Sequence, residues 1–493
     1  MDFKRSLENS GTSSAKRLRL NSKEFQKSNE NMPKPTTEET EHKETIVEFK
    51  FAVGNEQDKR ADHMNYACRS GKLEIVTDLL KNGFDVNSGD IANNTALHHA
   101  ASTGKVEIVK KLLENGASPY LANKFHFTPL HVASLNGHRQ VVKEFLNQNI
   151  YINFEMNVGE DALELAARKG HLEIVKELLN AGVAAYKKVD EDHMFSRFPA
   201  LSNLPSKLSD DHIEIVVEIL KRHPYPLHEA VYQIGLPEVN IIIRKLIQSG
   251  ISPNLQDKEG DTALHAAIID DGNFQAFVEF LKHAVNIEIR NNDKNTPLQI
   301  AVRDNKNEFA EELLKHGANP NCHEISEFGV KDTLLHIACR NENVLLVKIL
   351  LKYGTNVNGL DHNNKSPLHS ALMLDGSESR NEIIKELLEN GANVDIKTTD
   401  NETALHYAAD QDEIPEDLFQ YILKQCQDLN AKSSEDELTA LHLASEAGYE
   451  SFVKTLLNHG ADINIRNCDG YNPLENALNH EQEGVFKVMI YNN

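Results

Sequence analysis

Apolar and polar positions follow a pattern that returns about every 33 residues along most of the chain. In one copy, Thr95 precedes a short run of leucine and alanine, and Gly104 ends that run. A second run places Ile108, Val109 and Leu112 at helical spacing, so that one stripe of the helix is apolar. Threonine suits the N-cap of a helix, and glycine suits the left-handed residue that ends one. The pattern therefore predicts two short helices in each copy, followed by a polar connection.

The copies are numerous enough to account for the chain from about residue 62 onward. The segments TALHHAASTGKVEIVKKLLENGA, TPLHVASLNGHRQVVKEFLNQNI and DALELAARKGHLEIVKELLNAGV start 33 residues apart. The same start returns, with spacings of 33 to 37 residues, at Thr262, Thr296, Thr333, Ser366, Thr403, Thr439 and Asn472. Neither helix of a copy can bury its apolar stripe alone, whereas stacked copies bury it against each other. A period of this length predicts a solenoid.

These segments resemble ankyrin repeats, and the resemblance covers nearly all of residues 62–493. It implies an all-α solenoid of stacked helix-turn-helix units joined by hairpin-like fingers. We count thirteen units, of which three depart from the pattern. The unit near residue 62 lacks the usual start, as a polar end cap does, and residues 472–493 are expected to form the C-terminal cap. In residues 194–224 two prolines, Pro199 and Pro205, interrupt the first helix. We interpret that segment as a degenerate repeat, and a bend between two sub-arrays is the alternative.

The first 61 residues differ in composition from the rest of the chain. Residues 1–45 are poor in large apolar side chains, which predicts a disordered tail, and residues 46–61 are expected to be a linker. Within the tail, Lys4 and Arg5 are followed after ten residues by Lys16, Arg17 and Arg19. This spacing resembles a bipartite nuclear localisation signal, in which two basic clusters occupy two acidic grooves of an importin-type receptor at once. The alternatives are a basic solubilising tail and a contact with the acidic array.

The overall charge narrows the range of partners. The chain carries a net charge of −23, which a nucleic-acid backbone would repel, so no direct nucleic-acid binding is expected. A protein or peptide partner, above all a basic one, fits this charge better. The five cysteines are scattered without paired spacing, as in proteins that keep reduced thiols. No signal peptide or membrane-length apolar run is recognisable. We therefore expect a soluble monomer of the nucleus and cytoplasm.

Catalysis and metal binding are the next questions, because the chain has 23 histidines. Eight occupy the fourth position of a Thr-x-Leu-His motif or its variants, where the resemblance implies a bridge between the capping Thr and a neighbouring backbone: His98, His131, His228, His265, His336, His369, His406 and His442. Cys322, His323, His336 and Cys339 have almost the spacing of a zinc site. However, His336 is a motif histidine and Cys339 replaces a packed alanine, so no metal is expected. No nucleotide-binding or nucleophile motif is present, and we predict neither an enzyme nor a cofactor.

Two neighbouring fingers are unusually apolar. Most fingers are polar, as in QDKEGDT, and adjacent fingers are expected to lie side by side in such an array. The two apolar fingers are therefore expected to form one partner-binding patch made of Tyr120, Phe125, His126, Phe127, Tyr151, Phe154 and Met156. An aromatic cluster ringed by polar residues is typical of an interface hot spot. The alternative is that these side chains pack on neighbouring helices, Phe127 above all because it adjoins the cap.

Taken together, the sequence predicts a non-enzymatic protein-binding scaffold or adaptor. If the tail acts as a nuclear signal, the protein resembles in style the NF-kappa-B inhibitors. Two alternatives stay open: a regulatory or substrate-receptor subunit of a phosphatase or ubiquitin-ligase complex, and an ankyrin effector or toxin of an intracellular parasite. By resemblance, the finger asparagines are also candidate substrates of asparaginyl hydroxylases: Asn87, Asn153, Asn254, Asn321, Asn358 and Asn464.

Overall fold

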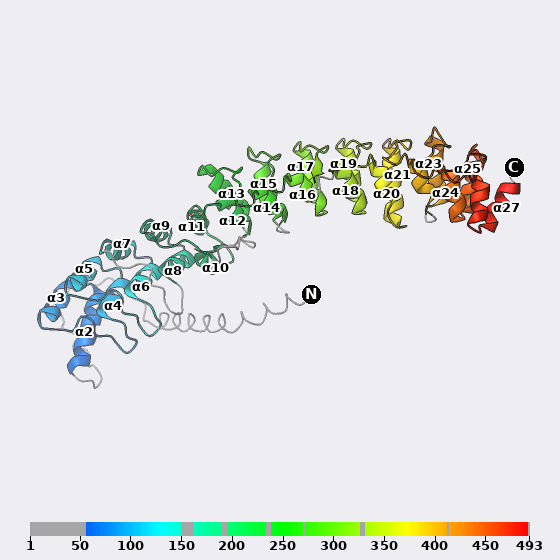
Figure 1. Ribbon diagram of the computed structural model, residues 1–493. Coiled ribbons are helices and arrows are strands. Elements are labelled where there is room, and N and C mark those ends of the chain that lie inside the picture. The colour runs from blue at the N-terminus through cyan, green and yellow to red at the C-terminus, as the bar shows by residue number, and fades with distance from the viewer. Residues whose placement is uncertain are drawn as a thin grey trace, which may run out of the picture. The chain divides into compact units, whose positions relative to one another are not determined.

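The computed structural model describes residues 56–148, 161–188, 196–232, 238–269, 273–325, 331–411 and 414–491. These residues form twenty-six helices, which follow one another as thirteen pairs, and four short strands. The chain divides into two compact units, Met1–Glu229 and Ala230–Asn493. Figure 1 shows the same arrangement within each unit, in which the two helices of every pair belong to two separate layers. The all-α repeat architecture predicted from the sequence is confirmed.

The first unit stacks five helix pairs through like-with-like contacts. Helices α2, α4, α6, α8 and α10 form one layer, and α3, α5, α7, α9 and α11 form the other. Their bounds are α2 Glu56–Ser70, α3 Leu73–Lys81, α4 Ala96–Ser102, α5 Val106–Glu114, α6 Pro129–Leu135, α7 Arg139–Asn147, α8 Ala162–Lys169, α9 Leu172–Asn180, α10 Pro199–Ser202 and α11 Asp210–Leu220. Strands β1 (Lys187–Lys188) and β2 (Ser196–Arg197) form an antiparallel pair in this unit.

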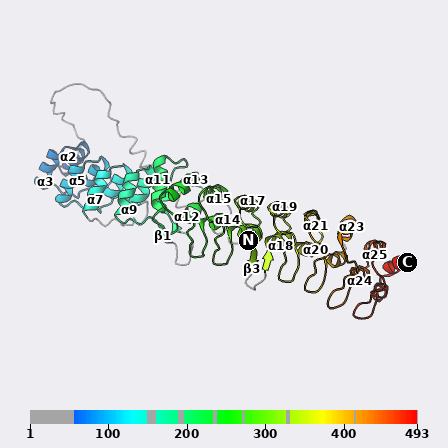
Figure 2. The ribbon, with the colours of Figure 1, turned by 90° about the horizontal axis from the view of Figure 1, so that it is seen from above.

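The second unit repeats this plan, and Figure 2 shows its fingers projecting from one side of the helices. The boundary between the units falls within α12 (Pro226–Tyr232). The helices that follow are α13 Val239–Gln248, α14 Ala263–Ile269, α15 Phe274–Leu281, α16 Pro297–Arg303, α17 Asn307–Lys315, α18 Leu334–Arg340, α19 Val344–Lys352, α20 Pro367–Leu372, α21 Glu378–Glu389, α22 Ala404–Ala409, α23 Glu416–Gln425, α24 Ala440–Ala447, α25 Glu450–Asn458, α26 Pro473–Asn479 and α27 Glu483–Tyr491.

The helices begin and end where the local chemistry predicts. Thr95, which has extended backbone angles, is the N-cap of α4, and its side chain and that of His98 form a reciprocal capping box. Pro129 occupies the first turn of α6, where its missing N–H leaves no bond unmade. At the other end, Gly170 is a left-handed C-cap of α8 with φ of 75°. The stripe predicted on the second helix is buried, since Ile108, Val109 and Leu112 are at most 2% exposed.

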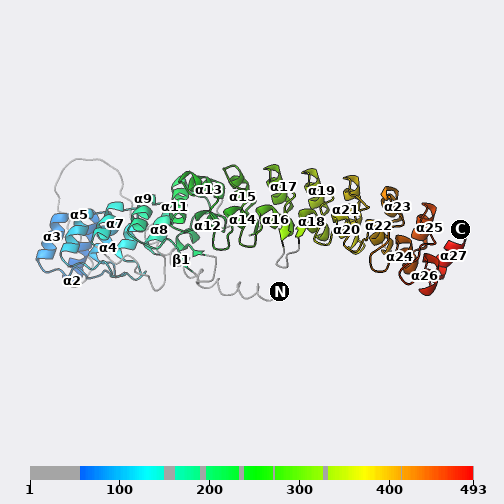
Figure 3. The ribbon, with the colours of Figure 1, turned by 45° about the horizontal axis from the view of Figure 1, so that its top comes forward.

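In the second unit, one finger is longer than the others and contains a short antiparallel strand pair. Strand β3 (His323–Ile325) pairs with β4 (Lys331–Thr333) in antiparallel register, with His323 opposite Thr333. Figure 3 shows this finger beside α16 and α18. Because β4 ends on Thr333, the N-cap of α18, the hairpin leads directly into the next repeat.

The degenerate segment 194–224 contributes a helix pair to the first unit. Helix α10 packs on α8, and α11 packs on α9, as regular repeats do. Helix α10 is only four residues long, with Pro199 in its first turn and Pro205 shortly after its end. The unit boundary follows within α12. At the start of the array, α2 begins at Glu56, ahead of residue 62, so its first turns include part of the segment assigned to a linker.

Candidate protein-binding surface

The second finger of the first unit is held in place by Asn123, a buried side chain at its turn. Its Oδ1 accepts hydrogen bonds from the backbone N–H groups of Phe125 (2.9 Å) and Phe127 (3.0 Å). Its Nδ2 donates to Asn94 Oδ1 of the preceding finger at 2.8 Å. Between these anchors, His126 has a φ of 64°, the left-handed conformation that glycine adopts in other fingers. The turn is therefore rigid although its sequence is unusual.

The described part of the aromatic patch is divided between surface and scaffold. Tyr120 is 42% exposed and His126 is exposed, whereas Phe125 and Phe127 are half-buried. The Phe127 ring lies 6.2 Å from the ring of His131, and the Phe127 carbonyl lies 2.9 Å from His98 Nε2. Phe127 therefore contributes to the scaffold as well as to the surface. The other predicted members, Tyr151, Phe154 and Met156, lie outside the described residues.

Two apolar residues that no sequence motif indicates lie on the same fingers. Ile91 is 92% exposed at the tip of the preceding finger, and Leu121 is exposed beside Tyr120. The two tips are adjacent, because the backbone N–H of Lys124 donates to the carbonyl of Ala92 at 2.9 Å. Ile91 carries no motif, so only its exposure identifies it. We use the name "finger patch" for Ile91, Tyr120, Leu121 and Phe125.

Five of the eight motif histidines are described with contacts from both ring nitrogens that bridge two repeats: His98, His265, His336, His406 and His442. In the first regular repeat, His98 Nδ1 accepts the backbone N–H of Thr95 at 3.1 Å and lies 2.9 Å from its Oγ1. The other ring nitrogen of His98 reaches the carbonyl of Phe127 in the next repeat. Burial lowers the pKa of His98 to about 4, so the ring is neutral at pH 7. Gln299 replaces histidine in one repeat and makes the same bridge, accepting from Thr296 N–H at 2.8 Å and donating to the His323 carbonyl at 2.7 Å.

Four of the six finger asparagines link their finger to the next, whereas Asn464 donates to Asp462 within its own finger. Asn321 Oδ1 accepts the backbone N–H of Asn356 at 2.7 Å, and Asn358 Oδ1 accepts that of Asn393 at 2.8 Å. Asn87 and Asn254 accept the equivalent bonds from the next finger, donated by the backbone N–H groups of Ser118 and Asn286. These amides therefore help to hold the stack together. Asn153 lies outside the described residues.

The residues with zinc-like spacing do not come together as a ligand set. Cys322 and Cys339 are buried, and burial raises the pKa of Cys322 to about 11. His336 uses both ring nitrogens, which lie 2.7 Å from Thr333 Oγ1 and 2.9 Å from the Lys365 carbonyl. The two cysteines therefore belong to the packed layers, and the histidine is a bridge.

A different set of three side chains lies close enough together to bind one metal ion, if distance alone is considered. In the part of the chain that the structure describes, ligand atoms of Asp332, Asp361 and His362 lie within 4.8 Å of one another. The Asp332 carboxylate is already bound by Arg340 at 2.7 Å. Asp361 Oδ1 accepts two backbone N–H groups of its own finger. These donors are thus engaged in structural bonds.

The ion pair between Asp332 and Arg340 joins the two ends of α18, which is the first helix of its repeat in the second unit. Asp332 stands directly before the N-cap Thr333, and Arg340 closes α18 seven residues after that cap. In the repeat of α22 the equivalent positions hold Glu402, directly before Thr403, and Asp410. The cation has therefore been replaced by a carboxylate.

The next repeat adds a third acid to this face. Glu446 stands at the same position in α24 as Asp410 does in α22, and these two helices pack together. The pKa of Asp410 is raised, first by partial burial and then by the negative charges of Glu446 and Glu402. Among the described residues, no hydrogen bond or ion pair joins the Asp410 carboxylate. We use the name "acidic face" for Met373, Glu402, Tyr407, Asp410 and Glu446.

Apolar and aromatic groups lie beside these acids. Burial, and after it the nearby Glu402 carboxylate, raises the pKa of the Tyr407 hydroxyl, and the Lys365 ammonium lies 5.5 Å from the centre of the Tyr407 ring. Met373, in the preceding repeat, is 51% exposed, and its sulfur lies 3.2 Å from Lys365 Nζ. Glu446 lies 3.4 Å from Asn476 Nδ2 and 3.3 Å from His480 Nδ1. The acidic face thus combines carboxylates with apolar surface.

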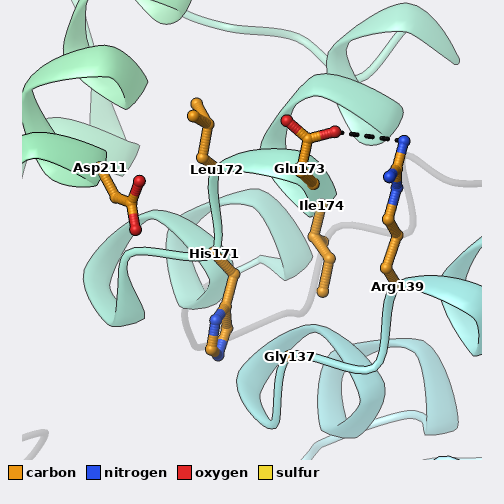
Figure 4. A pocket seen from close by; sticks show the side chains of 7 residues that line it. All are labelled: Gly137, Arg139, His171, Leu172, Glu173, Ile174 and Asp211. Atoms are coloured by element: carbon orange, nitrogen blue, oxygen red, sulfur yellow. Dashed lines mark ion pairs between the residues drawn. The ribbon is translucent and has the colours of Figure 1, made fainter.

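A surface pocket in the first unit belongs to the scaffold. Figure 4 shows the His171 ring pointing toward Gly137, with Arg139 paired to Glu173 at one side. His171 Nε2 lies 3.2 Å from the Leu135 carbonyl, and Arg139 also pairs with Glu177 at 2.6 Å. The polar groups that line this pocket therefore join one repeat to the next.

The fold and these bridges define a helical repeat array of the ankyrin type. The family profile described as "Ankyrin repeats (3 copies)" matches residues 40–123, 119–190, 227–324, 322–398, 373–467 and 405–493. The chain therefore belongs to the ankyrin-repeat family. Ankyrin repeats are protein-interaction modules, so the chain is a protein-binding repeat array.

Individual relatives match smaller parts of the chain. Protein phosphatase 1 regulatory subunit 12A of Mus musculus and of Rattus norvegicus is 37% identical over 54 residues, which is 11% of this chain and 5% of each relative. The chain thus matches only a small part of the length of these relatives. The crystal structure of the ankyrin repeat domain of Bcl-3, described as a unique member of the IkappaB protein family, is 26% identical, with a TM-score of 0.39. The match spans 47% of this chain and all of that one.

No helix in the described part of the chain is long and apolar enough to cross a membrane.

Proposed function

We propose that the protein is a non-enzymatic scaffold that binds a basic protein segment on its acidic face. The observation that carries this proposal is the difference between Arg340 and Asp410 at equivalent positions of two repeats of the second unit, which are separated by the repeat of α20. It leaves Glu402, Asp410 and Glu446 together without the arginine that neutralises Asp332. A net charge of −23 adds long-range attraction for a basic partner.

The geometry favours arginine as the side chain recognised. A guanidinium group can donate to two carboxylates at once, which an ammonium group does less well. The arginine stem and a neighbouring apolar residue would contact the exposed thioether of Met373 and the ring of Tyr407. An extended segment that crosses α20, α22 and α24 would meet these groups in succession.

The test uses the full-length chain and a labelled peptide of alternating arginine and alanine. Asp410→Arg recreates the arrangement of Asp332 and Arg340, and should weaken peptide binding about tenfold, equivalent to ~1.4 kcal/mol. Glu389→Arg, at the end of α21 in the other helix layer, is the matched control and should leave affinity unchanged. Equal losses in the two variants would indicate attraction by net charge alone and would refute a site on this face.

We propose the finger patch as a second contact surface, for an apolar part of a partner. Exposed Ile91, Tyr120 and Leu121 lie on fingers whose backbones are fixed by Asp90 and Asn123. Rigid apolar groups lose little entropy on binding, which suits them to an interface. In this proposal Tyr151, Phe154 and Met156 extend the same surface.

The tail supplies a proposal about location. Lys4, Arg5, Lys16, Arg17 and Arg19 would bind an importin-type receptor and distribute the protein between nucleus and cytoplasm. Replacing the last three by alanine should move a fluorescently tagged full-length protein out of the nucleus. Unchanged nuclear enrichment would exclude this role of the basic tail.

A phosphatase regulatory subunit is a second candidate function. It is supported by the 54-residue match to protein phosphatase 1 regulatory subunit 12A. The test is direct binding of purified phosphatase catalytic subunit to the full-length chain. Binding that survives Asp410→Arg would favour this role over recognition of a basic segment by the acidic face.

A further inference from the structure

Helix α3 exposes side chains that the following repeats bury. Ile75 is 43% exposed, whereas the residues 33 and 66 positions later, Ile108 and Val141, are 2% and 0% exposed. Leu79 is half-buried, and its counterpart Leu112 is inaccessible. The positions are equivalent in sequence and in secondary structure. The difference therefore reflects what covers them.

In the later repeats, the cover is the second helix of the preceding repeat. Helix α3 packs on α5, and α5 packs on α7, so each second helix protects the next one. Within the described residues, α3 has no such helix on its other side. Its edge is a strip of apolar surface that the repeat geometry shapes to receive a neighbour.

The chain carries a suitable segment directly before α2. Residues 46–53, with the sequence IVEFKFAV, contain six apolar side chains, whereas residues 1–45 are poor in large apolar groups. The family match begins at residue 40, so it includes this segment. Since α2 starts at Glu56 and packs on α3, the segment is tethered close to the exposed edge.

The segment before α2 is long enough to extend along helix α3. Ten residues, 46–55, span up to about 35 Å when extended. Helix α3 has nine residues and is about 13.5 Å long. The segment can therefore return from the start of α2 and lie along the whole of α3.

We propose that residues 46–53 dock on the Ile75 and Leu79 edge of α3 and take the place of a preceding repeat. Phe49 and Phe51 are the largest apolar groups available to cover this edge. Docking would close the open end of the first unit, so that a linker between tail and array becomes part of the array. This contact does not depend on which partner the acidic face binds.

The first test is hydrogen exchange of the full-length protein, read on peptides from residues 73–81. Replacing Phe49 and Phe51 by serine should accelerate amide exchange in α3 at least tenfold. The matched control replaces Phe3 and Phe25, which lie in the same N-terminal region, by serine and should leave α3 unchanged. Unchanged α3 exchange in the Phe49 and Phe51 variant would overturn the proposal.

A second measurement identifies the occupant directly. Benzoylphenylalanine in place of Phe49 should form an intrachain cross-link to the peptide that contains Ile75 and Leu79. Cross-links between two chains at that peptide would show that a second copy covers the edge, and cross-links confined to other regions would place the segment elsewhere. Either result would overturn docking of this segment in its own chain.

Discussion

The glycine before the second helix of a repeat provides a sharp test of the packing between repeats. Gly137 has a φ of 79°, and a Cβ added there would lie 2.7 Å from Cε1 and 3.0 Å from Nε2 of His171. Gly116 has a φ of 85°, but an added Cβ would meet no atom within 4 Å. The two glycines share the backbone strain and differ in the steric cost, so they form a matched pair.

The expected magnitudes follow from this difference. An alanine in the left-handed region costs roughly 1–2 kcal/mol at either position. Only Gly137→Ala must also displace the imidazole whose Nε2 lies 3.2 Å from the Leu135 carbonyl, and losing that hydrogen bond costs about 1 kcal/mol. Gly137→Ala should therefore be about 1 kcal/mol more destabilising than Gly116→Ala, before any strain from the displaced ring is added.

The assay must be local, because long repeat arrays do not unfold in a single step. Native-state hydrogen exchange should show peptides from α8 and α9 opening about fivefold more often in Gly137→Ala than in Gly116→Ala. In a His171→Ala background the clash is absent, and Gly137→Ala should cost only the backbone strain. Equal effects of the two glycine substitutions, or an undiminished cost without His171, would refute the assignment of this contact.

Three further predictions concern the bridges and the finger patch. Burial lowers the pKa of His98 to about 4, below the unfolded value of about 6.5, so its stabilising effect is present above pH 6.5 and is lost as pH falls toward 4. Native-state hydrogen exchange of peptides from α4 should show this loss in that window. Gln299→Leu leaves a backbone N–H and a carbonyl unpaired and should destabilise α16 by about 2 kcal/mol, whereas Gln299→His should be tolerated; exchange rates in α16 distinguish the two. Replacing Phe125 and Phe154 by serine should remove a subset of partners in affinity capture with mass spectrometry while the melting curve stays nearly unchanged, and a large loss of stability would show that these rings are core.

The fold was predictable because its determinants are local and repeated. Thr95 and His98 lie three residues apart in sequence, so the spacing alone indicates a cap and a bridge. Gln299 was less obvious, since an amide can replace the imidazole only if one side accepts and the other donates. That equivalence becomes visible only when the carbonyl of the next repeat is in place.

The acidic face was harder to foresee. Glu402 stands one residue before the cap Thr403 and Asp410 seven residues after it, in an ordinary-looking motif, and acidic residues are common on solenoid surfaces. Their importance depends on the fact that the residue before a cap faces the end of the following helix, as the pair of Asp332 and Arg340 shows. The exposure of Ile91 could not be predicted from the sequence either, because hydrophobicity does not reveal which finger residue remains uncovered in the fold.

The distribution of charge yields a last prediction that separates binding from stability. In the second-helix layer, acids are paired with cations of adjacent repeats, as Arg139 is with Glu177 and Lys348 with Glu382. Such exposed pairs contribute only about 0–1 kcal/mol each, so added salt should change unfolding little. Among the described residues Asp410 has no ion-pair partner and Glu446 lies only beside His480, so a basic ligand would supply these carboxylates with a permanent cation. Raising salt from about 0.05 to 0.5 M shortens the screening length to a few ångströms and should therefore weaken binding of the arginine peptide severalfold. If salt instead lowered the unfolding midpoint while leaving peptide affinity unchanged, the unpaired carboxylates would not be the binding determinant.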